Sequence, residues 1–330
     1  MQRIHINLST MTLLALAFLG LAACSTPASP PAPPPPPSPI AVALPPIKIA
    51  LALGGGAARG FAHVGVIKAL EAQGIVPDII VGTSAGSVVG ALYAAGYNGF
   101  ELQQLSMEMD ESQVSDWSMP NRGVIKGEAL QYFINNAVKQ RTLEKMKKIF
   151  AVVATDLHSG EMIVFRTGNT GMAVRASSAV PGIFQPVSIN GHEYVDGGLV
   201  APVPIRVARS LGADFVIAVD ISDKPSNNKT ESSIDVMLQT FNIMGQAISR
   251  NELPEADIVI RPVTPGISAT DFKGRHMAVL QGEKAVSLIL PELKEKLAKK
   301  NEGRMLATSP DSNKKLDVQV ENVLKPGVVN

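Results

Sequence analysis

Ser84 stands between two glycines in the stretch Gly82–Gly86, which reads Gly-Thr-Ser-Ala-Gly. An apolar run over 79–81 precedes this stretch, and a helical pattern of small residues follows from Ala85 to Ala95. A strand, a sharp turn and a helix in this order are typical of a nucleophile elbow, which holds a serine hydroxyl out of a sheet. The pattern predicts nucleophilic attack by Ser84, and the alternative is a Gly/Ser turn without chemistry.

A second candidate stretch is the glycine loop over 54–60, which lies between a predicted buried strand at 49–53 and a predicted helix at 61–73. Nucleotide binding fits it poorly. Arg59 takes the third glycine position of a dinucleotide fingerprint, and Phe61-Ala62 replace the Lys-Ser/Thr of a phosphate-binding loop. We interpret it as an oxyanion loop, in which backbone N–H groups stabilise a tetrahedral intermediate.

A third stretch supplies a carboxylate. Residues 192–195 predict a short strand that ends in Asp196-Gly197-Gly198. Taken alone, Asp-Gly is most typical of a hairpin turn. In the presence of an elbow serine it also fits a carboxylate that is held on a tight turn.

The elements around these motifs indicate an α/β fold. Apolar strands alternate with helical patterns from residue 47 onward, which predicts a mostly parallel sheet covered by helices. We place a catalytic domain at 47–300, with a helix over 277–300 that is interrupted at Pro291, and a disordered tail at 301–330. The Met-containing segment 100–119 is interpreted as a packed helix, with a lid as the alternative. Asp156 and His158 fall in a turn and are assigned structural roles.

The N-terminus predicts export and anchoring. Residues 1–23 resemble a signal peptide whose apolar run is too short to span a bilayer comfortably, and Leu21-Ala22-Ala23-Cys24 resembles a bacterial lipobox. Cys24 is the only cysteine of the chain and is the expected lipidation site. The Pro-rich stretch up to residue 46 predicts an extended tether. Ser25 favours the outer membrane, facing the periplasm, by resemblance to enterobacterial lipoproteins. An ordinary secretory signal or an N-terminal anchor is the alternative.

Composition excludes one class of partner. The 330 residues carry a net charge of +1 and only 5% aromatic residues, so neither charge nor base stacking favours nucleic acid. With 45% hydrophobic residues the chain can bury a large core.

The order of the three motifs resembles the patatin-like phospholipase family, and so do the stretches 81–86, 154–157 and 177–182. The resemblance runs from Ile49 to about Asp220, with its motif core at 49–204, and implies a three-layer fold with a central mostly parallel sheet. The family's usual Gly-Gly-Gly-x-Arg/Lys-Gly has Ala57 at its third glycine here.

The resemblance also implies a mechanism. Ser84 would attack an acyl ester of a lipid, and Asp196 would accept its proton and later activate water, without a catalytic histidine, a metal or a cofactor. The N–H groups of Gly55, Gly56 and Ala57 would hold the oxyanion. Arg59 would either steer an anionic head group or pack structurally.

Two alternatives remain open. One is an α/β-hydrolase with a Ser–His–Asp triad, for which His276 is the late histidine that the chain order requires. The other is a non-catalytic envelope lipoprotein that binds lipid or a protein partner. The residues do not specify the head group, the acyl position or the chain length of a substrate.

Overall fold

We analysed a computed structural model, which describes residues 46–307 except 111–113, 115, 117–121, 223–229, 265 and 268–271. The predicted signal peptide, Cys24 and almost all of the tether lie outside the described residues. Within those residues, no helix is both long and apolar enough to cross a membrane.

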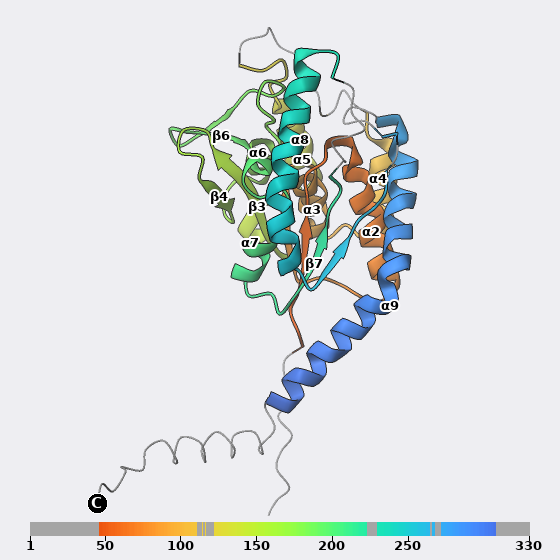
Figure 1. The fold of residues 1–330 in the computed structure, drawn as a ribbon. Helices are drawn as coiled ribbons and strands as arrows, with labels where there is room; N and C mark the ends of the chain where they lie inside the picture. Colours follow the sequence, from red (N-terminus) through yellow and green to blue (C-terminus); the bar gives the residue numbers. More distant parts are fainter. Residues whose placement is uncertain are drawn as a thin grey trace, which may run out of the picture. The chain divides into compact units, whose positions relative to one another are not determined.

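The strands of the described residues form one eight-stranded sheet (Figure 1). The hydrogen-bonded neighbours follow the order β5-β6-β3-β2-β1-β7-β8, and β4 pairs additionally with β3. The neighbours β3, β2, β1, β7 and β8 are parallel, while β4 and β6 are antiparallel to β3. The strand bounds are β1 Ile49–Leu53, β2 Ile79–Thr83, β3 Ile149–Asp156, β4 Met162–Phe165, β5 Val187–Ile189, β6 His192–Asp196, β7 Phe215–Val219 and β8 Ile258–Ile260.

Helices cover both faces of the sheet, as the alternation of side chains along β1 shows. Leu51 and Leu53 pack in a cluster with α2, α3, α4, α5 and α9, whereas Ala50 and Ala52 pack in a second cluster with α7. Successive strand residues point to opposite faces, so a strand buried on both sides is apolar throughout. The helix bounds are α2 Phe61–Ala72, α3 Ala85–Ala95, α4 Gly99–Glu108, α5 Glu128–Ala137, α6 Thr170–Ser177, α7 Ile205–Ser210, α8 Ser233–Glu252 and α9 Arg275–Ala307.

This architecture confirms the predicted three-layer α/β fold. The predicted strands at 49–53 and 79–81 and the predicted helix at 85–95 are present, and β4 returns antiparallel to β3. Part of the 100–119 segment is a packed helix, because α4 lies against α2 and α9. The rest of that segment lies largely outside the described residues.

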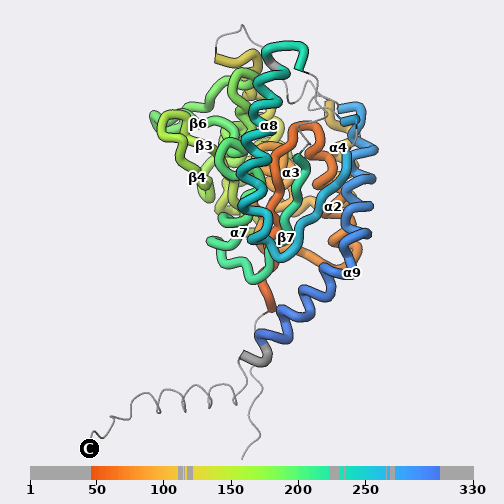
Figure 2. The backbone as a smooth tube through the Cα atoms, viewed as in Figure 1, coloured from red at the N-terminus to blue at the C-terminus, as the bar shows by residue number. Residues whose placement is uncertain are grey.

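The prediction for the C-terminal helix is wrong in two respects. The helix α9 is not interrupted at Pro291, and it continues to Ala307, past the boundary that we placed at residue 300. A proline inside a helix removes one hydrogen bond, and packing elsewhere can compensate for it. The α9 residues Val286 and Leu293, on either side of Pro291, are buried in the core. Figure 1 shows α9 changing direction partway along its length, and Figure 2 shows it beside α2.

Candidate active site

Ser84 occupies a strained turn between β2 and α3. Its backbone has φ 52° and ψ −124°, a region that costs a residue with a Cβ about 1–3 kcal/mol. The glycines on either side make the turn possible. A Cβ on Gly82 would lie 2.5 Å from the Gly86 carbonyl oxygen, and one on Gly86 would lie 2.1 Å from the carbonyl oxygen of Leu53. The predicted elbow geometry is therefore present, and Ser84 is 9% exposed.

Asp196 reaches Ser84 because β2 and β6 end on the same edge of β3. The last residue of β2 pairs with Val153, and Asp196, the last residue of β6, pairs with Ala154. Strand β4 pairs with both of these β3 residues and occupies the opposite edge. The ends of β2 and β6 therefore meet along one edge of β3. The Asp-Gly pair does not make a hairpin turn, because a 3-10 turn, Gly197–Leu199, follows instead.

The Asp196 carboxylate is fully buried, and burial raises its pKa to about 7. The Ser84 hydroxyl and the Gly198 amide act in the opposite direction, since both stabilise the charged form. Oδ1 accepts a hydrogen bond from the Gly198 N–H at 2.7 Å, while Oδ2 has no partner of standard geometry among the described residues. The Ser84 hydroxyl thus lies near enough to the Asp196 carboxylate to influence its pKa, although no hydrogen bond of standard geometry joins the two side chains.

The glycine loop runs directly against the serine. A Cβ on Gly55 would lie 3.2 Å from the Cβ of Ser84. The Gly55 N–H, however, donates to the carbonyl oxygen of Pro202 at 3.0 Å, so Gly55 would have to give up this bond to act as an oxyanion donor. We therefore no longer assign it that role. For the Gly56 and Ala57 amides, no acceptor is present in the described part of the chain.

Ala57 departs from the glycine pattern of the loop, and Arg59 matches it. Ala57 has φ 50°, a left-handed conformation that favours glycine, so the departure from the third glycine costs strain but keeps the N–H. Arg59 is only 5% exposed, and its Nε donates to the carbonyl oxygen of Ile221. This placement favours the packing role of Arg59 over steering of a head group.

The histidines take no part in the Ser84–Asp196 contact in the described residues. His63 is fully buried, and its Nε2 lies 2.8 Å from the Gly54 carbonyl oxygen. Burial lowers the pKa of His63 to about 4, so the neutral ring donates this bond at neutral pH. His192 contacts Asp156, His158 contacts Glu193, and His276 is exposed at the start of α9.

The turn role predicted for Asp156 is present, since its Oδ1 accepts from the amides of His158 and Ser159. The helical pattern around His63 predicts no catalytic role for it, and it carries no signal of the Gly54 carbonyl oxygen as its partner. Ser177 was noted only within a family stretch, yet its hydroxyl accepts from the Ser84 N–H at 2.9 Å.

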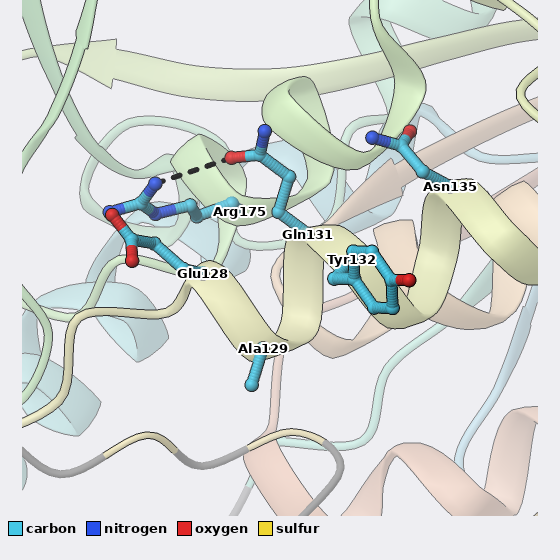
Figure 3. Close-up of a pocket in the computed structure, with 6 residues that line it drawn as sticks. All are labelled: Glu128, Ala129, Gln131, Tyr132, Asn135 and Arg175. Carbon is cyan, nitrogen blue, oxygen red and sulfur yellow. Dashed lines mark hydrogen bonds between the residues drawn. The ribbon is translucent and has the colours of Figure 1, made fainter.

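A pocket of about 520 Å³ lies elsewhere, on α5 and α6, and includes none of the predicted site residues. Figure 3 shows Arg175 of α6 extending along α5 toward Glu128, with a hydrogen bond to Gln131. Arg175 also donates twice to the Lys126 carbonyl oxygen, so this guanidinium fixes α6 to the segment before α5. We do not regard this pocket as the reaction centre. Across the described residues, no cluster of three or more His, Cys, Asp or Glu side chains could hold a metal ion.

Comparison with known proteins gives a consistent result. The family model described as patatin-like phospholipase matches residues 51–209. An uncharacterized NTE family protein of Mycobacterium tuberculosis is 32% identical over 205 residues, which cover 61% of this chain and 57% of that protein. Human patatin-like phospholipase domain-containing protein 6 is 36% identical over 184 residues, 53% of this chain and 13% of that protein. The chain thus spans just over half of the mycobacterial relative and a small part of the human one.

Among solved structures, VipD from Legionella pneumophila superposes with a TM-score of 0.51 at 15% sequence identity. The match covers 75% of this chain and 67% of VipD, and it concerns the fold alone. Together with the family match over the elbow, the glycine loop and the Asp196 turn, it agrees with the architecture described above. The chain therefore carries a patatin-like phospholipase domain over residues 51–209.

Proposed function

We propose that this protein is a serine acyl hydrolase that cleaves acyl esters of lipids through a Ser84–Asp196 dyad. The observation that carries the proposal is the fully buried Asp196 carboxylate next to the Ser84 hydroxyl, with a pKa raised to about 7. A carboxylate with an ordinary pKa is too weak a base for a serine hydroxyl, and desolvation makes it a stronger one.

The proposed reaction has two halves. Asp196 accepts the proton of Ser84 as the Oγ attacks the ester carbonyl carbon, and the amides of Gly56 and Ala57 hold the oxyanion. When the intermediate collapses, the alcohol leaves with the proton from Asp196, and the acyl group stays on Ser84. Water then attacks the acyl-enzyme while Asp196 accepts its proton. Collapse of the second intermediate releases the carboxylic acid and restores both side chains.

The assignment of a dyad over a triad is supported by the positions of the histidines. His63 is bonded to the Gly54 carbonyl oxygen, and His158 and His192 contact carboxylates other than Asp196. His276, the candidate of the triad alternative, lies exposed on α9. A carboxylate that contacts the nucleophile directly needs no intervening imidazole.

A serine-reactive fluorophosphonate probe tests this function. We expect the wild-type protein to be labelled and the Ser84→Ala protein to remain unlabelled, because the probe reacts with activated serines. Circular dichroism checks that both proteins are folded. A folded wild-type protein that resists the probe would argue for the non-catalytic alternative, in which the fold binds lipid or a partner.

The substrate and the location are proposed together. The lipobox-like Leu21–Cys24 stretch supports lipidation of Cys24, and the Pro-rich residues after it support a tether. A lipid-anchored enzyme at the bacterial envelope would lie beside bilayer lipid, the substrate that the family match suggests. Ser25 supports the outer membrane as the site of anchoring, facing the periplasm.

Metabolic labelling with a clickable palmitate analogue tests the anchor. The wild-type protein should carry the label and fractionate with membranes, whereas Cys24→Ser should lose both properties. Label that persists on Cys24→Ser would contradict lipidation at this residue.

A further inference from the structure

The C-terminal end of α6 and the residues just after it contact the backbone of both proposed dyad residues. The Ser177 Oγ accepts a hydrogen bond from the Ser84 N–H at 2.9 Å. Two residues later, the carbonyl oxygen of Ala179 accepts from the Asp196 N–H at 3.0 Å. We propose that the Ser177 hydroxyl and the Ala179 carbonyl oxygen are positioning groups, which hold the nucleophile and the base at a fixed separation, with the Ser177 hydroxyl as the specific side-chain element.

The Ser84 N–H needs such a partner. Strand β2 ends one residue earlier and α3 begins one residue later, so neither element supplies an acceptor for this amide. Ser84 is also held at φ 52°, a conformation that persists only when surrounding contacts enforce it. A buried N–H without an acceptor is costly, and Ser177 is the acceptor that the structure provides.

The Ser177 hydroxyl is itself fixed. It donates to the carbonyl oxygen of Val153 at 2.5 Å, and the side chain is fully buried. Val153 belongs to β3, the strand along whose edge β2 and β6 meet. A Cβ on Gly197 would lie 2.3 Å from the same Val153 oxygen, so the turn after Asp196 packs against this point as well. The elbow at Ser84 and the turn after Asp196 are therefore both positioned by contacts with the same strand, β3.

The helix that carries Ser177 is anchored at its other end. The Asn169 side chain caps α6 by accepting from the Met172 N–H, and Thr170 Oγ1 donates to the Arg141 carbonyl oxygen. Arg175 donates to the Lys126 carbonyl oxygen. With α6 held at both ends, the Ser177 hydroxyl is set in place before substrate arrives, and catalytic groups displaced by about 1 Å can lose on the order of 100-fold in rate.

Ser178 provides a matched control within the same segment. Its hydroxyl is buried and has no hydrogen-bond partner among the described groups. Ser178→Ala removes the same atom as Ser177→Ala, one position away, without removing a contact to the dyad.

The inference rests on the proposed dyad, so one experiment tests both the dyad and the positioning role of Ser177. Hydrolysis of a p-nitrophenyl acyl ester and the rate of fluorophosphonate labelling are compared for wild type and for the Ser84→Ala, Ser177→Ala, Ser177→Thr and Ser178→Ala variants, with thermal melts as the folding control. Ser177→Ala should lower kcat and the labelling rate about 10- to 100-fold at nearly unchanged KM. Ser178→Ala should stay within about 2-fold of wild type, and Ser177→Thr, which keeps the hydroxyl, should recover most of the loss.

Equal rates for folded Ser177→Ala and Ser178→Ala would overturn the positioning role while leaving Ser84 labelling intact. If wild type and Ser84→Ala reacted alike with the probe, the dyad and the inference would both be wrong. Should Ser177→Ala not fold, Ser177→Cys keeps the size of the side chain but is a poor acceptor. A folded Ser177→Cys protein with wild-type kcat would likewise overturn the proposal.

Discussion

Thr83 and Asp196 pair with consecutive residues of β3, the first at the end of β2 and the second at the end of β6. The residue after Thr83 is the proposed nucleophile. The distance between nucleophile and base is therefore set by the register of a buried sheet and does not depend on a flexible loop. Sites built on regular elements keep their geometry better than sites on loops, which suits a dyad that has no imidazole to bridge a gap.

The pH dependence of activity should follow Asp196. The base must be deprotonated, and burial raises its pKa to about 7. We expect kcat/KM to rise with pH through about 7 and then to level off, as measured by ester hydrolysis between pH 5 and pH 9. A profile that is flat down to pH 5 would show that no group with this pKa controls the reaction.

Asp196 should also make stability depend on pH. Its pKa rises from 3.8 to about 7 on folding, so the folded state binds the proton more tightly and stability falls as pH rises between these values. Asp196→Asn removes this titration. Relative to wild type, the variant should gain on the order of 2–3 kcal/mol in free energy of unfolding between pH 5 and pH 8, measured by urea denaturation. A pH-independent difference would contradict the raised pKa.

His63 should make stability depend on pH in the direction opposite to that of Asp196. Its pKa is lowered from 6.5 to about 4 on folding. The contribution of neutral His63 to the free energy of unfolding is therefore complete above pH 6.5 and is lost as the pH falls toward 4. His63→Gln can still donate to the Gly54 carbonyl oxygen but does not titrate. From pH 7 to pH 4.5, wild type should lose about 2–3 kcal/mol more than His63→Gln in urea denaturation. His63→Leu is the control, because it removes the donor and should destabilise at every pH.

Replacing Ala57 with glycine should stabilise the protein. Its φ of 50° is strained for alanine, so Ala57→Gly should stabilise the protein by about 0.5–1 kcal/mol and retain activity, since the N–H remains. The matched control is Ala58→Gly, because Ala58 is buried and has no positive φ, and it should destabilise. Chemical denaturation of both variants gives the comparison. Equal destabilisation by the two substitutions would contradict the strain at Ala57.

The sequence predicted the parts of this site that are encoded locally. The elbow around Ser84 and the strand ending at Asp196 follow from patterns within a few residues, and the alternation of strands and helices follows from periodicity. Two hydrogen bonds of the site join residues that are far apart in the chain. One runs from the Gly55 N–H to the Pro202 carbonyl oxygen, and the other runs from the Ser84 N–H to the Ser177 hydroxyl. Local patterns carry no information on such pairs.

The predicted break in the C-terminal helix was wrong for a related reason. A proline predicts a helix break from local sterics, whereas α9 passes Pro291 with buried side chains on either side of it. The packing that compensates for the lost hydrogen bond is tertiary, so the local rule overstates the break.

The measurement that tests the central claim most directly is a double-mutant comparison of ester hydrolysis. Ser84→Ala, Asp196→Asn and the double variant should each lose on the order of 10³-fold or more in kcat, and the double variant should be little worse than either single one, because the two residues act as one unit. His192→Gln and His276→Gln, each checked for folding by circular dichroism, should retain most of the wild-type kcat. A folded histidine variant as inactive as Ser84→Ala, together with a largely active Asp196→Asn, would contradict the dyad and assign the site to a triad.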